Sequence, residues 1–266
     1  MSENRLSSEL GTYVETRQEA VEDRGQVGTI TVKGKTHLNL IGRSMILQLK
    51  ESFEKVFEIE DLRTIILTGW GNASFIGGVD IAEMEGLNEK SARIFIRELH
   101  ELCSTIRKAR VPVFAKIRGY CLGGGLEIAA ACDFRFASPS SKFGMPEVRV
   151  GIPSVIEAAL LPRLIGWGKT RELVLLGTML NADQAKSCGL IEGLASEENL
   201  DQFVWERVKN IFDAGPNAIR LQKELIQKWE RLSLEEAIET GIDFFARAYE
   251  TDEPQRMMQS FLNRQK

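Results

Sequence analysis

The stretch from Arg118 to Asp133 reads Arg-Gly-Tyr-Cys-Leu-Gly-Gly-Gly-Leu-Glu-Ile-Ala-Ala-Ala-Cys-Asp and carries the strongest pattern in the chain. The β-branched run Val111 to Ile117 precedes it and predicts a strand that leads into three glycines, Gly123 to Gly125. A helix-forming run follows from Leu126. The N–H groups at such a helix start carry partial positive charge, so they can bind an anion or a developing oxyanion. A turn that serves only close packing fits the segment equally well.

Strand and helix patterns alternate on both sides of this turn, which indicates an α/β architecture. A hairpin is predicted from Val14–Ala20 and Gln26–Val32 around the turn residues Glu22-Asp-Arg-Gly25. A further strand is expected at Thr64–Thr68 and helices at Met45–Phe57 and Ser91–Arg107, where apolar residues recur every three or four positions.

Strand patterns stop after about residue 195. Four helices are expected beyond it, over Leu200–Phe212, Asn217–Trp229, Leu234–Tyr249 and near Met257–Leu262. We therefore divide the chain into an α/β core, 1–195, and a helical region, 196–266. The helical region has more apolar positions than single helices can bury, which predicts an oligomer interface. The positions are Phe203, Leu221, Phe244, Phe245 and Phe261.

The composition is that of a globular protein, because 43% of the 266 residues are apolar and 27% are charged. The net charge is −4 and no run of five like charges occurs, which argues against nucleic acid as a partner. No apolar stretch is long enough for a membrane span, and the polar opening Met1-Ser-Glu-Asn-Arg lacks a secretory pattern. We expect a cytoplasmic protein with no membrane partner.

The metal-binding and nucleophilic residue types are few and scattered. The cysteines, at 103, 121, 132 and 188, lie apart in apolar segments, which is typical of buried small hydrophobic residues. His37 and His100 stand outside any metal or nucleophile motif, so each is expected to be solvated or hydrogen-bonded. The sequence predicts no metal site.

A second glycine turn, Ser74-Phe-Ile-Gly-Gly-Val-Asp80, follows the strand at 64–68 and offers a second set of N–H donors. The segment Phe143-Gly-Met-Pro-Glu147 then places a carboxylate twenty positions after Glu127. A helix outward and a strand back can return the chain to the first carboxylate. Two carboxylates beside an oxyanion hole suit acid–base chemistry at a carbon next to a carbonyl. Taken alone, Glu147 fits a solvated loop residue.

These segments resemble the crotonase superfamily of enoyl-CoA hydratases and isomerases in order and spacing. The resemblance rests on both glycine turns, on the Phe-Gly-Met-Pro-Glu147 segment and on Gly177-Thr-Met-Leu-Asn-Ala182 with its later Gly189-Leu-Ile. It covers about residue 26 to the end. It implies a fold of repeated ββα units that form a spiral, followed by a helical trimerisation region, and hence a homotrimer or a dimer of trimers.

The resemblance also implies roles for single residues. The N–H groups of Val79 and Gly124 correspond to the oxyanion hole that holds the thioester carbonyl and its enolate. Glu127 and Glu147 correspond to the two hydratase carboxylates that hold a water, and the Glu147 position delivers a proton to the α-carbon. We expect further substrate contacts from neighbours of these residues, namely Gly78, Asp80, Tyr120, Gly123, Ile152 and Pro153. For Tyr120, simple packing at a strand end is the alternative.

An enoyl-CoA hydratase is the function that the resemblance implies, with acyl-CoA as substrate and no separate cofactor. Isomerases of the family commonly keep only the Glu147 carboxylate, so Glu127 favours hydration. The alternatives are an isomerase, a lyase or decarboxylase that uses the same enolate, and a non-catalytic acyl-CoA-binding scaffold. Hydratases usually have a glycine-rich segment where this chain has Ile152–Ala159, which leaves the acyl group open.

Two further motifs have local interpretations. Gly166-Trp-Gly-Lys-Thr170 resembles the end of a phosphate-binding loop, but the expected helix before it favours a turn between helices. Ser154-Val-Ile-Glu157 has the spacing of a capping box, in which both side chains satisfy N–H groups at a helix start. The alternative is that Glu157 is a third acid of the site.

Overall fold

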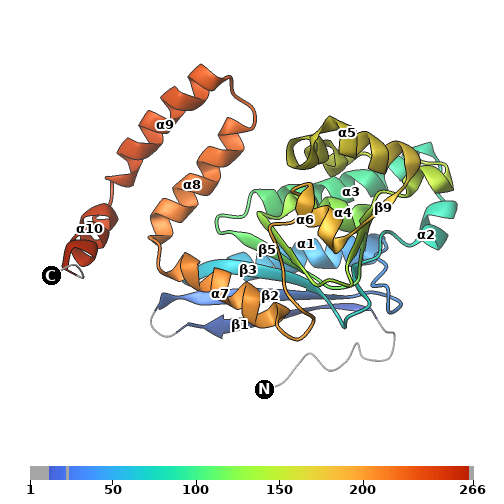
Figure 1. Ribbon diagram of the computed structural model, residues 1–266, viewed down its shortest axis with the longest axis horizontal. Coiled ribbons are helices and arrows are strands. Elements are labelled where there is room, and N and C mark those ends of the chain that lie inside the picture. The colour runs from blue at the N-terminus through green and yellow to red at the C-terminus, as the bar shows by residue number, and fades with distance from the viewer. Residues whose placement is uncertain (1–11, 22–23, 264–266) are drawn as a thin grey trace.

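The computed structural model describes residues 12–21 and 24–263, which form two sheets with helices around them (Figure 1). The larger sheet has the strand order β1-β2-β3-β5-β7-β10. Its strands are β1 Tyr13–Ala20, β2 Gln26–Lys33, β3 Leu62–Gly69, β5 Val113–Ile117, β7 Phe134–Ala137 and β10 Gly193–Leu194. All neighbours pair in parallel except β1 and β2. The predicted hairpin is therefore confirmed, and the Glu22 and Asp23 part of its turn lies outside the described residues.

The smaller sheet has the order β4-β6-β8-β9, with β4 Ser74–Ile76, β6 Tyr120–Leu122, β8 Lys142–Gly144 and β9 Met179–Asn181. Each long strand β3, β5 and β7 is followed by a short strand of this sheet, so the chain repeats a ββ step along the molecule. Gly119 permits one of these steps, because its φ is +64° and a Cβ there would lie 2.0 Å from the Ala73 carbonyl oxygen.

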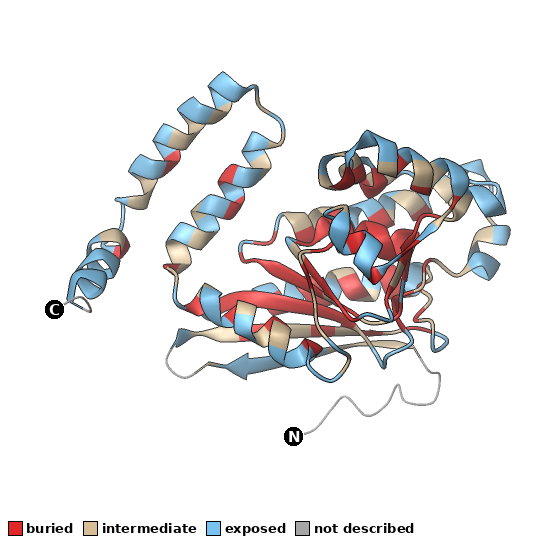
Figure 2. Cartoon of the chain, viewed as in Figure 1, coloured by how far each residue is buried: buried red, intermediate tan, exposed pale blue. Residues whose placement is uncertain are grey.

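Helices cover both faces of the larger sheet. The first is α1, Arg43–Phe57, which buries its apolar stripe with α3, Glu89–Arg107, and α4, Gly124–Ala131, in the central core. On the other face α7, Leu200–Phe212, buries Leu200, Val204, Val208 and Phe212, a four-residue spacing that forms one helix face. Figure 2 shows these buried residues in the middle of the molecule.

The remaining helices are short or lie away from the core. They are α2 Ile81–Glu85, η2 Glu147–Val150, η3 Ile156–Leu160, α5 Leu161–Leu176, α6 Ala182–Ser187, α8 Pro216–Trp229, α9 Leu234–Ala248 and α10 Glu253–Asn263. The phosphate-loop-like segment lies within α5, where Gly166 has a non-helical φ of 73° and kinks the helix. The predicted turn between helices is thereby confirmed. No helix in the described ranges is long and apolar enough to span a membrane.

The helices α8, α9 and α10 extend away from the sheets (Figure 1). The predicted interface residues divide into two groups. Phe203 packs within the chain, with its ring 5.7 Å from that of Phe136, and Phe244 is buried against Lys228 and Arg247. Phe245 and Phe261 are exposed, and Leu221 is half-buried. Phe203 and Phe244 therefore have partners in their own chain, which corrects their assignment as residues left uncovered.

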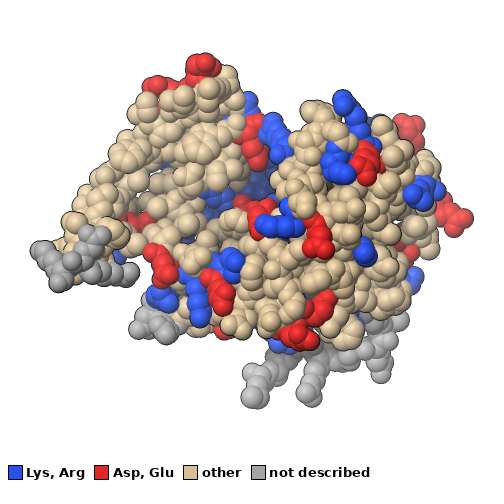
Figure 3. All heavy atoms as spheres, in the orientation of Figure 1, with Lys and Arg blue, Asp and Glu red and all other residues tan. Residues whose placement is uncertain are grey.

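Side-chain charge and thiols follow the sequence expectations. Figure 3 shows Lys and Arg interspersed with Asp and Glu over the visible face, in agreement with the small net charge. Cys103, Cys121 and Cys132 are buried and Cys188 is half-buried, all as free thiols. Although α7 lies beyond residue 195, it packs on the larger sheet. The division of the chain into a core, 1–195, and a helical region, 196–266, stays a prediction.

Candidate active site

Three parallel strands of the smaller sheet bring the site together. Ile76 of β4 pairs with Cys121 of β6, which pairs with Phe143 of β8. Because the carboxyl ends of parallel strands lie at one edge of a sheet, the segments that follow these strands meet there. These segments are the glycine turn at 77–79, the glycine turn at 123–125 and the Glu147 loop. The two glycine motifs and the second glutamate are therefore neighbours in space.

The two glycine turns are in contact, and each contains a backbone N–H group without a backbone acceptor in the described residues. Gly78 and Gly123 have φ values of 116° and 51°, which favour glycine. In the described part of the chain, neither the Val79 N–H nor the Gly124 N–H donates a backbone hydrogen bond. A Cβ added at Gly124 would lie 3.2 Å from Val79 Cγ2, so the two turns are in contact. This arrangement has the donors that an oxyanion hole requires.

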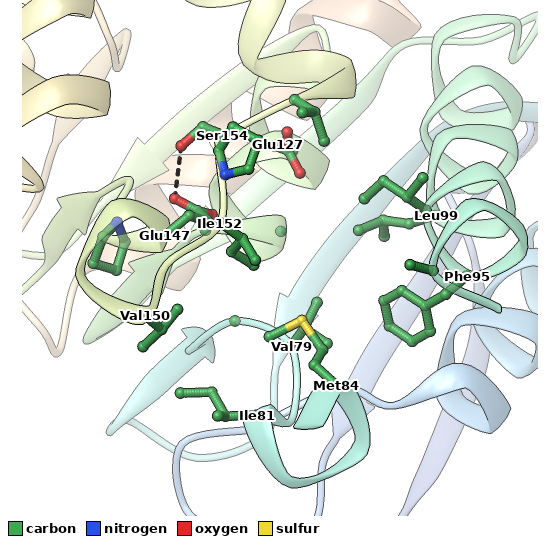
Figure 4. A pocket seen from close by; sticks show the side chains of 18 of the residues that line it. Val79, Ile81, Met84, Phe95, Leu99, Glu127, Glu147, Val150, Ile152 and Ser154 are labelled. Carbon is green, nitrogen blue, oxygen red and sulfur yellow. Dashed lines mark hydrogen bonds between the residues drawn. The ribbon is translucent and has the colours of Figure 1, made fainter. Parts of the chain in front are cut away.

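These turns open into a cavity of about 790 Å³. Its lining includes six of the sequence-predicted site residues besides the two glutamates: Gly78, Val79, Gly123, Gly124, Ile152 and Pro153. Apolar side chains form most of the remaining wall: Ile81, Met84, Leu87, Phe95, Ile96, Leu99, Val150 and Val155. Figure 4 shows the two glutamates and Ser154 along one wall, with Met84, Phe95 and Leu99 on the facing walls.

Glu127 lies in the first turn of α4 and its side chain is almost fully buried, with 4% of the residue exposed. Its Oε1 accepts a hydrogen bond from the Ala158 N–H at 3.2 Å. Burial, which penalises the charged form, is the largest cause that raises the pKa of Glu127 to about 8, and the nearby carboxylates Glu147 and Glu157 contribute to the same rise. Glu127 therefore holds its proton up to a higher pH than an ordinary carboxyl group does.

Glu147 begins η2 and is half-buried in the same cavity. Ser154 Oγ donates a hydrogen bond of 2.8 Å to Glu147 Oε2, and Figure 4 marks this contact. Burial raises the pKa of Glu147 as well. Gly123 makes room for this side chain, because a Cβ at position 123 would lie 2.6 Å from Glu147 Oε1.

The Glu147 carboxylate lies close enough to Glu127 for its charge to raise the pKa of Glu127, so the two carboxyl groups are coupled. Like charges in a buried site disfavour double ionisation, so the pair holds a single proton between its two apparent pKa values. The upper of these values lies near that of Glu127, about 8. A pair that keeps one proton at neutral pH can both accept and donate a proton, which general acid–base catalysis requires.

The capping-box interpretation of Ser154 and Glu157 is wrong. The helix η3 starts after Val155, which makes no side-chain cap, and Ser154 instead binds Glu147. Glu157 is 3% exposed and points inward, where both of its oxygens lie within hydrogen-bond distance of His100 Nδ1. These contacts form in place of the capping box because a buried carboxylate needs a hydrogen-bond partner. For His100, the expectation of a hydrogen-bonded side chain is confirmed.

Two predicted substrate contacts lie elsewhere. Asp80 caps α2 by accepting a hydrogen bond from the Ala82 N–H at 3.1 Å, and it pairs with Lys35 at 3.4 Å. Tyr120 starts β6 and is 39% exposed. Neither Asp80 nor Tyr120 is among the described residues that line the cavity. Their contact with substrate stays a prediction, because CoA extends beyond an acyl pocket.

No group of three or more His, Cys, Asp or Glu side chains within 12–21 and 24–263 is arranged to hold a metal ion. The prediction that the protein acts without a metal or a separate cofactor stays a prediction. The residues that sequence reasoning missed are Ser154 as a partner of Glu147, Ala158 as a partner of Glu127, and the His100–Glu157 pair. Only Ser154 and Glu157 had a sequence signal, which indicated a different contact.

A family model described as enoyl-CoA hydratase/isomerase matches residues 22–266. The chain belongs to this family. Among curated relatives, it is 30% identical over 247 residues to the crotonyl-CoA hydratase of Syntrophomonas wolfei, which covers 92% of this chain and 95% of the relative. It is 28% identical to the short-chain-enoyl-CoA hydratase of Clostridium acetobutylicum, with the same two coverages. Membership of the crotonase superfamily is therefore established, as the motifs indicated.

Solved structures agree in fold. The crystal structure of enoyl-CoA hydratase from Bacillus anthracis superposes with a TM-score of 0.88 at 28% identity, and covers 94% of this chain and 96% of that one. The enoyl-CoA hydratase from Thermoplasma volcanium gives a TM-score of 0.83 at 28% identity, with 93% and 96% covered. The predicted fold class, an α/β crotonase-like fold, is confirmed, while trimerisation through the helical region stays a prediction.

Proposed function

We propose that the protein is an enoyl-CoA hydratase, which adds water across the 2,3 double bond of an acyl-CoA thioester. The observation that carries the proposal is the meeting of a buried and a half-buried carboxyl group with two N–H donors that have no backbone acceptor, all in one cavity. The names of the relatives support the same chemistry. A non-catalytic protein that only binds acyl-CoA has no use for a second carboxyl group in the cavity, because removing a carboxyl group from water costs free energy.

In the proposed reaction the thioester oxygen accepts hydrogen bonds from the Val79 and Gly124 N–H groups. These donors stabilise the negative charge that moves onto this oxygen when a nucleophile adds at C3. Because the N–H groups are fixed by the glycine turns, they need no reorganisation during the step. The α4 helix start at Gly124 adds its partial positive charge.

Glu127 and Glu147 together supply the proton transfers. In the reactive form of the pair the single proton is on Glu147 and Glu127 is ionised. The water oxygen forms a bond to C3 while its proton passes to Glu127, and the π electrons move to the thioester oxygen as an enolate. Glu147 then donates its proton to C2 and the enolate collapses to the saturated thioester. One proton is taken and one is given, so the pair ends with the single proton with which it began. A base whose pKa is raised toward 8 accepts the water proton more readily than an ordinary carboxylate.

The cavity wall favours an aliphatic acyl group. Met84, Phe95, Leu99 and Val150 line it together with Ile81, and none of these can pair with a polar acyl substituent. A hydroxyl or carboxylate that lies against these side chains would lose its water without a partner, although Glu89, Arg93 and Arg149 line other parts of the cavity. We infer that the substrate carries an unsubstituted hydrocarbon chain. We also propose that the reaction needs no cofactor other than the CoA that is part of the substrate.

Isomerisation is the second candidate, since the family includes both activities. Moving a double bond needs one group that removes a proton and returns it, and Glu147 alone can do this. The buried Glu127 opposite it favours hydration, because a second group that accepts the water proton is then present.

An absorbance assay on the purified protein tests the proposal. The 2-enoyl thioester absorbs in the near ultraviolet, and addition of water removes this conjugation. We expect loss of this absorbance with a straight-chain 2-enoyl-CoA. Unchanged absorbance across chains of different length, with tight binding of acyl-CoA, would instead support a non-catalytic binding protein.

A further inference from the structure

Glu157 is a buried carboxyl group for which the mechanism above has no role. It lies in η3, is 3% exposed, and is absent from the described residues that line the cavity. Burial of a carboxyl group is unfavourable unless hydrogen bonds compensate for it. The residues that form hydrogen bonds with Glu157 therefore indicate what its carboxyl group does.

His100 is the principal partner of Glu157. Its Nδ1 lies 3.0 Å from Oε1 and 3.3 Å from Oε2 of Glu157, so one imidazole N–H faces both carboxylate oxygens. An ionised carboxylate can only accept hydrogen bonds, and this geometry makes Nδ1 the donor. His100 is on α3, one residue after the cavity residue Leu99, and 48% of its side chain is exposed. Its ring connects the buried carboxylate to the protein surface.

Glu157 is linked to Glu127 in two ways. Along the backbone, the next residue is Ala158, whose N–H donates to Glu127 Oε1 at 3.2 Å. Through space, the Glu157 carboxylate lies close enough to Glu127 for its charge to disfavour ionisation of Glu127. A contact that holds Glu157 therefore fixes the hydrogen-bond donor of Glu127 and also places a negative charge beside it.

The other titratable groups around the two carboxyls are few. From α3, Glu157 faces His100 and the buried Cys103 thiol, whose pKa is raised well above its usual value by burial and then by the two glutamates. From α4 it faces Glu127, and Glu127 in turn faces Glu147 from η2. The thiol stays neutral, so His100 is the group that can hold the Glu157 side chain by a hydrogen bond.

We propose that His100 and Glu157 form a positioning pair for Glu127, in which the His100-bound Glu157 carboxylate fixes the Ala158 N–H on Glu127. The proposal rests on the hydratase function, because a singly protonated Glu127–Glu147 pair is its active form. Glu157 and His100 touch neither the cavity nor the reacting atoms, so their effect is exerted through Glu127. The expected signature is a change in pH dependence.

The sign of this change follows from charge. The active pair loses its proton as pH rises through the pKa of Glu127, so the rate falls on the alkaline side near pH 8. In Glu157→Gln the amide oxygen can still accept from His100, so the Ala158 N–H stays in place and only the charge that raises the pKa of Glu127 is removed. Glu127 then loses its proton at lower pH. We expect the alkaline limb of kcat/KM to move down by about one pH unit in Glu157→Gln, the size typical of one nearby charge.

Variants of His100 provide the matched comparison. His100→Asn keeps an N–H donor near the Nδ1 position and should preserve the wild-type alkaline limb. His100→Leu removes the donor that holds Glu157 and thereby releases the Ala158 N–H, whose hydrogen bond favours ionised Glu127, so the limb should move up. Because His100 is half-exposed, both variants are expected to fold. Glu101→Gln, which removes an exposed charge from the same helix, should leave the limb in place.

A second measurement does not depend on activity. The infrared difference between the substrate-free protein and its Glu127→Gln variant isolates the protonated carboxyl band of Glu127, and a pH titration of this band gives its pKa. The same subtraction should give a lower midpoint in the Glu157→Gln background and a higher one in the His100→Leu background. An unchanged midpoint and alkaline limb in both backgrounds would overturn the positioning role while leaving hydration intact. These two opposite shifts of the midpoint in a protein without hydratase activity would instead keep the pair and reject the proposed function.

Discussion

Glu127 combines a helix start, almost complete burial and a raised pKa, and its proton therefore contributes to stability as well as to chemistry. A carboxyl group with a folded pKa of about 8 and an unfolded value near 4.5 binds its proton more tightly in the folded protein. The folded state is then favoured at low pH, and this contribution is lost as pH rises toward the folded pKa.

The stability prediction follows from this sign. Between pH 5 and pH 7.5 the free energy of unfolding of the wild type should fall more steeply than that of Glu127→Gln, by up to about 1.4 kcal/mol per pH unit. Urea unfolding of both proteins at several pH values measures the difference. Parallel pH profiles would show that Glu127 keeps an ordinary pKa.

The catalytic prediction concerns both glutamates. Glu127→Gln and Glu147→Gln each keep the shape of the side chain but remove a proton carrier, so each should lower hydration by at least about 100-fold. The double variant should cost far less than the product of the two, because the groups act as a unit. Steady-state rates, with acyl-CoA binding as a control for folding, decide this. Full activity in either single variant would exclude a joint role.

Single residues of the site were predictable to different degrees. Glu127 and Glu147 could be found because each follows a glycine or a turn at the end of a strand pattern. Glu157 was misread because its spacing from Ser154 matches a capping box, whereas its real partner, His100, lies 57 positions away in sequence. A local pattern cannot show a contact of that range.

At the scale of elements, long helices were predictable and short strands were not. The expected helix at 200–212 matches α7, and the expected helix at 45–57 lies within α1, because apolar periodicity over several turns is a strong signal. Strands β8 and β9 have three residues each and β10 has two, which is too short for alternation to appear. The smaller sheet, on which the site is built, was therefore visible only through its glycine turns.

The close packing of α4 on β4 at Gly125 can be tested by substitution. A Cβ at Gly125 would lie 2.1 Å from the Ile76 carbonyl oxygen, so Gly125→Ala must push the helix away from the strand. We expect a loss of stability above about 2 kcal/mol together with lower activity, since the displaced helix carries Gly124 and Glu127. Gly86→Ala is the control, because nothing lies within 4 Å of a Cβ there. Equal melting temperatures for the two variants would show that the close contact is unimportant.

For the whole molecule, the exposed stripe of α9 is the main feature left uncovered. Leu234, Ile238, Ile242 and Phe245 follow helical spacing and are each more than half exposed. In Figure 2 this helix stands away from the buried centre, with mostly exposed residues. The sequence indicated an apolar excess here but could not distinguish Phe244, which is buried in the chain, from its exposed neighbour Phe245.

We predict that this stripe assembles the chain into a trimer or a pair of trimers. Light scattering at micromolar concentration should give three or six times the chain mass. Phe245→Asp should lower this mass because it places a charge in an apolar contact. Glu239→Ala, which changes a neighbouring polar position on the same helix, should leave the mass unchanged. A wild-type protein that is monomeric at this concentration would contradict the prediction.

Hydration itself is tested most directly by oxygen labelling. The protein is incubated with a straight-chain 2-enoyl-CoA in ¹⁸O-labelled water, and the product thioester is analysed by mass spectrometry. If Glu127 and Glu147 activate a water, one ¹⁸O atom must appear in the product at C3, and Glu127→Gln must strongly reduce its rate of appearance. A product that has moved its double bond and carries no ¹⁸O, from every chain length tried, would contradict hydration.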